Sequence, residues 1–214
     1  MLSIFFPRKC IFCGQLLSKD ELDLCHDCRT GAPVFTGSKT KIPFVAQWSA
    51  IWYYNDSVRR SIHKYKFFNN RSYCDAFGRM LAMKALTASL ASCDLITWVP
   101  TSFIRRLRRG YDQSELLANA VGRELGMKPR RTLRKIRNNP PQSKLKAPAQ
   151  RRANVLGVYA PYHPERYAGK RILLLDDVVT TGSTASECAR ILMTSGAAEV
   201  YLVAIAAASE EKKQ

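Results

Sequence analysis

The sequence has no uninterrupted apolar run long enough to cross a membrane, although 46% of its 214 residues are hydrophobic. A membrane-spanning helix needs about 20 consecutive apolar residues, whereas the apolar residues here are spread along the chain and suffice for a packed core. The apolar N-terminus, residues 1–7, is too short for the core of a signal peptide, and its charged residues follow it. We therefore expect a cytoplasmic protein without membrane insertion.

Acidic residues and histidines are scarce. The chain has 17 Asp and Glu against 34 Lys and Arg, which gives a formal net charge of +17. This imbalance indicates a polyanionic partner or substrate, such as a phosphate compound, nucleic acid or a membrane surface. The three histidines, His26, His63 and His163, are scattered, and no Ser/His/Asp or Cys/His arrangement stands out. We therefore do not expect a covalent nucleophile.

The seven cysteines, an odd number, fit a reducing compartment better than a disulfide framework. Four of them form two CxxC pairs, Cys10 with Cys13 and Cys25 with Cys28, separated by eleven residues. Two such pairs can bring four thiolates to one metal ion in the tetrahedral arrangement that suits Zn²⁺. A redox dithiol is the alternative, but two pairs together favour a structural zinc knot over residues 1–33. A knot of this size depends on its metal for folding.

An apolar run leads directly into two carboxylates, Asp176 and Asp177. The preceding residues, Ile172–Leu175, are typical of a buried strand, and a turn of small hydroxyl residues around Gly182 follows before helical spacing begins near Ala185. Ligands bind at the carboxyl ends of strands in open α/β sheets. A hydroxyl- and glycine-rich loop at a helix N-terminus presents backbone N–H groups to an anion, usually a phosphate. An ordinary capped turn is the alternative.

This stretch resembles the phosphoribosyl pyrophosphate (PRPP) signature of type I phosphoribosyltransferases. The resemblance implies a Rossmann-like α/β domain with a parallel sheet, beside the small four-cysteine zinc knot. It places Asp176 and Asp177 at the ribose hydroxyls, where adjacent carboxylates can also reach a hydrated Mg²⁺. It places the loop at the 5′-phosphate, and the residues of this loop are Thr180, Thr181, Gly182, Ser183 and Thr184.

Strands alternate with helices along the rest of the chain, which indicates a parallel sheet. Apolar and aromatic patterns predict strands at 45–54, 95–100, 155–159, 171–175 and 200–206. Helical spacing predicts helices at 56–65, 75–90, 114–125 and 185–194, the third of them closed by Gly126. Residues 34–44 have the composition of a linker. We expect the phosphoribosyltransferase-like domain to occupy residues 45–209.

A basic loop follows the strand that ends at Pro100. By the resemblance, a loop at this position binds pyrophosphate, and Lys64 would help to neutralise it. Guanidinium groups suit phosphate oxygens because they present paired N–H donors. The candidate residues of the loop are Thr101, Ser102, Arg105, Arg106, Arg108 and Arg109.

A second basic segment, residues 128–152, contains ten Lys or Arg and no acid. Two prolines at 140–141 break any helix there, so we expect mostly loop. A long basic loop beside a phosphate site can be an active-site hood or a nucleic-acid-binding arm, and a solvated charge run is the third alternative. The candidate nucleic-acid-binding residues are Arg130, Arg131, Arg134, Lys135 and Arg137.

In their order along the chain, these motifs resemble the ComF family. Besides the knot and the PRPP motif, the resemblance rests on Lys64–Lys66, Val99–Thr101, Arg109–Ser114, Pro141–Ser143 and Arg151–Val155. Tyr111 and Asp112 stand where the family commonly has Phe and Asn. The family joins a zinc-finger-like N-terminus to a phosphoribosyltransferase domain, and its members are linked to DNA uptake in natural transformation.

The resemblance leaves the class of function open. An enzyme would bind PRPP with Mg²⁺ and transfer the phosphoribosyl group to an unidentified acceptor by positioning and electrostatics. A non-catalytic protein would bind single-stranded DNA and aid the handling of incoming DNA in the cytoplasm, alongside proteins of the competence machinery. A regulator that senses PRPP is a third alternative. The two carboxylates favour PRPP, whereas the charge of +17 favours nucleic acid.

Overall fold

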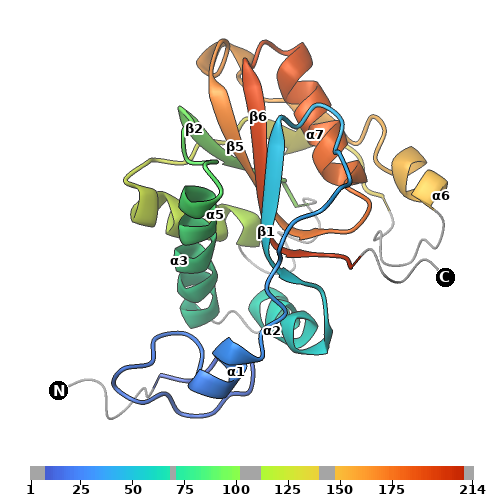
Figure 1. Ribbon diagram of the computed structural model, residues 1–214. Helices are drawn as coiled ribbons and strands as arrows, with labels where there is room; N and C mark the ends of the chain where they lie inside the picture. The colour runs from blue at the N-terminus through green and yellow to red at the C-terminus, as the bar shows by residue number, and fades with distance from the viewer. Residues whose placement is uncertain (1–7, 68–70, 102–111, 140–147, 210–214) are drawn as a thin grey trace.

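The computed structural model describes residues 8–67, 71–101, 112–139 and 148–209, and Figure 1 shows how its elements are arranged. Four parallel strands form a central sheet in the order β1-β6-β5-β2. The strands are Gln47–Tyr53 (β1), Glu199–Ala207 (β6), Arg171–Val179 (β5) and Leu95–Trp98 (β2). The α/β architecture with a parallel sheet is therefore confirmed.

Strand β5 lies inside the sheet and is buried on both faces. Residues Ile172–Leu175 are each at most 1% exposed, as an unbroken apolar run in a parallel sheet predicts. Leu173 and Leu175 belong to the core on one face, whereas Ile172 and Leu174 belong to the core on the other. The strand continues beyond its predicted end to Val179, so that the two aspartates are part of it.

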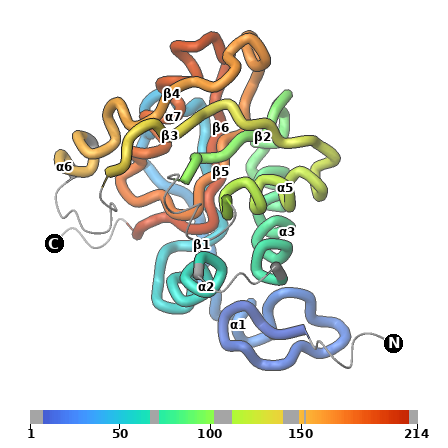
Figure 2. Tube along the Cα trace, turned by 180° about the vertical axis from the view of Figure 1, so that it is seen from behind, coloured from blue at the N-terminus to red at the C-terminus, as the bar shows by residue number. Residues whose placement is uncertain are grey.

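Helices cover both faces of the sheet (Figures 1 and 2). The helices on the two faces are Arg71–Thr87 (α3), Gln113–Leu125 (α5) and Ser183–Thr194 (α7), whereas Asp56–Phe67 (α2) lies beyond the carboxyl end of β1. α3 and α5 pack together on one face, and α7 packs on the other. A Cβ at Gly78 on α3 would lie 2.4 Å from the Cβ of Ala120 on α5, so this spacing of the two helices requires glycine. In the described part of the chain, no helix has the length and apolar character needed to cross a membrane.

The basic segment 128–152, which we expected to be mostly loop, contains a strand and a helix. Strand β3, Leu133–Lys135, pairs antiparallel with β4, Tyr159–Pro161, and helix α6 spans Pro148–Ala153. The strand predicted at 155–159 thus begins only at Tyr159, because pairing with β3 decides where the backbone becomes extended. We call β3, β4 and α6 the hood; it packs beside α7. A short 3-10 helix, Pro164–Arg166, follows β4.

The N-terminal knot, residues 8–30, packs against the face of the sheet that carries α3 and α5. Its short helix α1 spans His26–Thr30. The ring of Phe12 lies 4.9 Å from that of Trp52 on β1, between centroids. The Ser61 hydroxyl on α2 donates to the carbonyl oxygen of Ile11 (2.6 Å). The knot therefore shares one apolar core with the sheet and its helices.

The segment 34–44, expected to be a linker, is mostly exposed but is anchored to the sheet and to the loop before α7 at a few points. The N–H of Phe35 donates to the carbonyl oxygen of Ile51 on β1 (3.0 Å). The indole N–H of Trp48 donates to the carbonyl oxygen of Thr40 (3.0 Å). Ile42 is 4% exposed and lies against Gly182, in the loop before α7. We call this segment the strap, because it joins the knot to the far face of the sheet.

Candidate functional site

A cavity of about 520 Å³ opens at the carboxyl edge of the sheet. Its walls include Tyr54 directly after β1, Val99 directly after β2, and Val178 near the end of β5. The hood closes the other side with Lys135, Arg151 and Tyr159, together with Asn139 and Val155 from the segments between its elements. The cavity thus lies where parallel α/β sheets bind ligands.

The two aspartates of β5 line this cavity. The backbone N–H of Asp177 donates to Oδ1 of Asp176 (2.8 Å), and Lys66 at the end of α2 forms an ion pair with Asp177. The side chains of Lys66 and Asp177 are 31% and 30% exposed, so a ligand can reach both. Burial raises the pKa of Asp176 to about 7, although the Lys66 cation acts in the opposite direction. Asp177 is therefore paired with a cation, whereas Asp176 is largely shielded from water.

The hydroxyl-rich loop between β5 and α7 turns at Gly182, directly before the helix. Gly182 precedes α7 with φ of 71°, a left-handed conformation that favours glycine. A Cβ at this position would lie 3.0 Å from Ile42 of the strap. The hydroxyl oxygens of Thr181 and Ser183 lie 2.7 Å apart, while Thr180 and Thr184 line the cavity. The loop and the N-terminus of a twelve-residue helix thus face the same space as the two aspartates.

The structure brings together part of the predicted pyrophosphate side. Thr101 lines the cavity, and its hydroxyl donates to Oδ1 of Asp112 (3.1 Å). Lys64 does not line the cavity, whereas Lys66 does. Side chains two residues apart on a helix point in directions about 200° apart. Lys66 therefore lines the cavity, and Lys64 lies on another side of the helix. Ser102, Arg105, Arg106, Arg108 and Arg109 lie outside the described residues.

The five predicted nucleic-acid-binding residues fall into two groups. Lys135 lines the cavity, with its Nζ 5.6 Å from the ring centroid of Tyr159. The other four are exposed: Arg130, Arg131, Arg134 and Arg137. Arg134 and Lys135 differ because both lie on β3, in which alternate side chains point to opposite faces. Sequence reasoning therefore missed a hood wall made by Lys135 and Tyr159, because the β3–β4 pairing that forms it joins distant segments.

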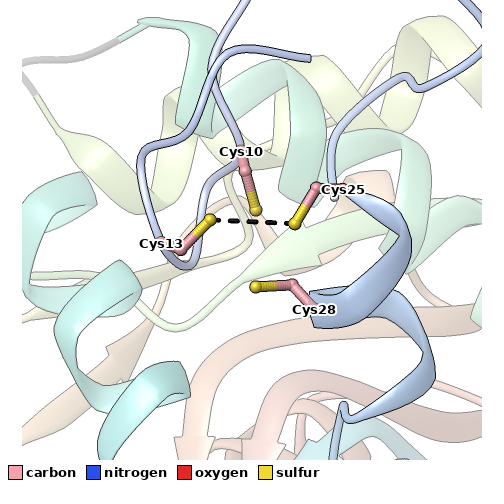
Figure 3. A group of neighbouring side chains, drawn as sticks. All are labelled: Cys10, Cys13, Cys25 and Cys28. Atoms are coloured by element: carbon pink, nitrogen blue, oxygen red, sulfur yellow. Dashed lines mark hydrogen bonds between the residues drawn. The ribbon is translucent and has the colours of Figure 1, made fainter. Parts of the chain in front are cut away.

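The four cysteines of the knot converge on one point (Figure 3). Their sulfur atoms all lie within 4.8 Å of one another, and those of Cys13 and Cys25 are 3.7 Å apart. A tetrahedral Zn²⁺ with Zn–S bonds of about 2.3 Å requires S–S distances of roughly 3.8 Å. Burial opposes ionisation of Cys10, but backbone hydrogen bonds from Cys25, Cys13 and Phe12 lower its pKa to about 7. The donor set and its spacing can therefore hold a metal ion.

Comparisons with known proteins give the class of the chain. A family model described as the phosphoribosyl transferase domain matches residues 111–214. The chain is 29% identical over 202 residues to the DNA utilization protein YhgH of Salmonella typhi, with 90% of this chain and 87% of the relative covered. It is 26% identical over 227 residues to Competence protein F of Haemophilus influenzae, with coverage of 95% and 99%. Identity to Competence protein ComFC of Streptococcus pneumoniae is 26% over 233 residues, with coverage of 90% and 96%.

A solved structure, the glutamine PRPP amidotransferase from B. subtilis, overlaps 66% of this chain and 30% of that one, at 22% identity and a TM-score of 0.46. The matched domain, the parallel sheet and the cavity at its carboxyl edge define a protein with a type I phosphoribosyltransferase-like fold. With the N-terminal cysteine cluster in front of that domain, the chain is similar along most of its length to relatives named for competence and DNA utilization.

Proposed function

We propose that the protein binds PRPP with Mg²⁺ in this cavity and transfers its phosphoribosyl group to an acceptor during the handling of incoming DNA in the cytoplasm. The observation that carries the proposal is the meeting of two adjacent carboxylates and a hydroxyl-rich helix N-terminus in one cavity. A phosphorylated ribose offers a vicinal diol to the first and a phosphate to the second. The DNA context is taken from the names of the relatives.

Each wall of the cavity has a part in this proposal. The loop 180–184 binds the 5′-phosphate through backbone N–H groups and hydroxyls, and Asp176 and Asp177 accept hydrogen bonds from the ribose hydroxyls. When bound with PRPP, Mg²⁺ offsets the charge of the pyrophosphate. Lys66 exchanges its ion pair with Asp177 for the pyrophosphate oxygens, beside Thr101. Positioning and electrostatic stabilisation of the leaving pyrophosphate then supply the catalysis.

The hood side of the cavity is suited to the acceptor. Tyr159 and Val155 offer apolar surface to a planar ring, and the amide of Asn139 offers polar contacts. Lys135 and Arg151 add two cations on this side, while both acids that line the cavity lie on β5. This distribution of charge favours an acceptor with carbonyl or anionic oxygens.

Calorimetric titration with Mg²⁺ and PRPP tests the proposal. The wild type should show saturable binding, and an Asp176→Ala/Asp177→Ala variant should bind at least roughly 100-fold more weakly, because hydrogen bonds to charged groups contribute about 1.5–3 kcal/mol each. An Asp20→Ala/Glu124→Ala variant removes two exposed acids that do not line the cavity, and it should bind as the wild type does. No binding by the wild type at millimolar PRPP would rule out the proposed substrate.

We also propose that the knot holds Zn²⁺ as a structural ion. All four protein ligands are thiolates, which leaves no coordination position for a substrate. The first pair sits on a tight turn in which the N–H of Gly14 donates to the carbonyl oxygen of Cys10 (2.9 Å). The second pair spans the start of α1, where Cys25 precedes the helix and Cys28 lies in its first turn.

Single-stranded DNA binding is a second candidate function, favoured by the outer surface of the hood. Four exposed arginines, Arg130, Arg131, Arg134 and Arg137, lie on or beside β3. The guanidinium carbon of Arg131 lies 5.2 Å from the ring centroid of Tyr162. Cations along a backbone track, with an aromatic ring among them, are typical of surfaces that bind single strands.

Salt titration of oligonucleotide binding tests this second function. Each arginine that neutralises a phosphate contributes about 0.7 to the slope of log affinity against log salt for single strands. An Arg134→Ala/Arg137→Ala variant should therefore lower the slope by about 1.4 and leave PRPP binding unchanged. A Lys39→Ala/Lys170→Ala variant, which loses two exposed cations elsewhere, is the matched control. Equal loss in both variants would indicate adhesion by net charge rather than a site.

A further inference from the structure

Two buried residues outside the cavity exchange hydrogen bonds across the protein. Tyr65, at the end of α2, and Gln113, at the start of α5, are 5% and 3% exposed. The Tyr65 hydroxyl donates to the carbonyl oxygen of Gln113 (2.5 Å), and Nε2 of Gln113 donates to the carbonyl oxygen of Tyr65 (2.5 Å). We call this reciprocal pair the clasp. It joins two segments that are 48 residues apart in the sequence.

The clasp lies directly behind the pyrophosphate side of the cavity. Each of its members is followed in the chain by a cavity-lining residue, Lys66 after Tyr65 and Ser114 after Gln113. The residue before Gln113, Asp112, is 8% exposed and accepts hydrogen bonds from the N–H of Ser114 (3.1 Å) and the hydroxyl of Thr101 (3.1 Å). One buried network thus ties together three lining residues from three separate segments: Lys66, Thr101 and Ser114.

Packing alone does not require this network. The ring of Tyr65 already packs edge-on against Phe77, with centroids 5.6 Å apart, and a phenylalanine would keep that contact. Hydrogen bonds between buried groups add directionality that apolar contact lacks, and a fully satisfied network fixes one arrangement. The arrangement fixed here is the register of α2 against α5, and with it the position of the Lys66 cation.

We propose that the clasp is a positioning device for the pyrophosphate side: it holds Lys66 opposite Thr101 and Ser114, so that these groups meet the leaving pyrophosphate as one preorganised unit. The inference rests on the proposed PRPP function. Lys66 pairs with Asp177 in this structure, and the clasp holds the backbone next to Lys66 in place while its ammonium group reaches the pyrophosphate. The 5′-phosphate loop lies against a different element, the strap, through Gly182 and Ile42. The two ends of PRPP should therefore respond to different substitutions.

Calorimetry with three probes, each with Mg²⁺, separates the two ends: inorganic pyrophosphate, ribose 5-phosphate and PRPP. A Tyr65→Phe variant should bind pyrophosphate and PRPP roughly 10-fold more weakly, the effect of about one lost hydrogen bond on the position of a charged group. Its affinity for ribose 5-phosphate should stay within about twofold. Tyr73→Phe is the matched control, because Tyr73 is also buried against Phe77 (8% exposed) and does not line the cavity.

A second variant keeps the test decisive if Tyr65→Phe does not fold. Gln113→Met removes the other hydrogen bond of the clasp, from Nε2 to the carbonyl oxygen of Tyr65, with little change in side-chain volume, and it should show the same selective loss. Hydrogen exchange of the ligand-free protein should be faster at 62–66 and 113–116 in both variants. Equal weakening of pyrophosphate and ribose 5-phosphate, or unchanged affinity for pyrophosphate, would overturn the clasp proposal. A wild type that binds none of the three probes would instead overturn the PRPP function, and the clasp proposal would fall with it.

Discussion

Removal of the proposed Zn²⁺ from the knot should destabilise the whole protein, not the N-terminus alone. Chelation is expected to release residues 8–30 from the core, and with them the packing of Phe12 against Trp52. Loss of one buried phenylalanine costs about 3–5 kcal/mol, which lowers the melting temperature of a chain of this size by roughly 10 °C. Calorimetric melting with and without a chelator, together with metal analysis by mass spectrometry, measures this effect.

Two cysteine variants provide the matched comparison. Cys28→Ser removes one ligand of the cluster and should reproduce the effect of the chelator, with less than one metal ion retained per chain. Cys93→Ser removes a thiol of similar, intermediate exposure outside the cluster and should retain both metal and stability. A Cys28→Ser protein that melts like the wild type would show that the knot is held by its packing and not by an ion.

Asp176→Asn should stabilise the ligand-free protein while it weakens PRPP binding. Burial raises the pKa of Asp176 from its ordinary value of 3.8 to about 7. The folded state therefore binds this proton more tightly than the unfolded state, and stability falls as pH rises from about 4 to about 7. Asparagine keeps an oxygen for the N–H of Asp177 and carries no charge. We expect a gain of about 1–3 kcal/mol at pH 8 and little gain at pH 4, after allowance for the partial exposure of the site.

A substitution that raises stability but weakens PRPP binding would identify Asp176 as a carboxylate kept for function rather than for folding. PRPP affinity should fall by at least roughly tenfold in Asp176→Asn, because a charged acceptor of the ribose hydroxyls is lost. Asp94→Asn is the control, because the pKa of Asp94 is shifted in the opposite direction. This exposed carboxylate is paired with Arg171, which lowers its pKa, so its loss should not stabilise the protein. Equal melting temperatures for wild type and Asp176→Asn from pH 4 to pH 8 would contradict a strained carboxylate at this position.

The features that the sequence predicted well are those encoded within a short stretch. Residues 171–194 carry their own strand, turn and helix signals, so the aspartates and the loop appear in the expected order. The cysteine pairs are equally local, and their convergence is visible from spacing alone. The glycine cap at 126 is also confirmed, with φ of 66°.

The features that could not be predicted depend on contacts between distant segments. The β3–β4 pairing joins residues about 25 positions apart, and it decides that Lys135 lines the cavity while its neighbour Arg134 is exposed. The choice of Lys66 over Lys64 depends on the rotation of α2, which the clasp with Gln113 fixes from a segment 48 residues away. Local periodicity carries no information on either contact.

The strap has a consequence for the way this chain can be divided. It runs from the cysteine knot along β1 and brings Ile42 against Gly182, so this one short segment links the two motifs that stand furthest apart in the sequence. A cut at residue 45 would remove the support of the phosphate loop and uncover Trp52, which is 3% exposed in the intact protein. The cysteine motif and the phosphoribosyl motif are therefore not interchangeable modules. An insertion or a domain swap at their junction would reach the ligand site itself.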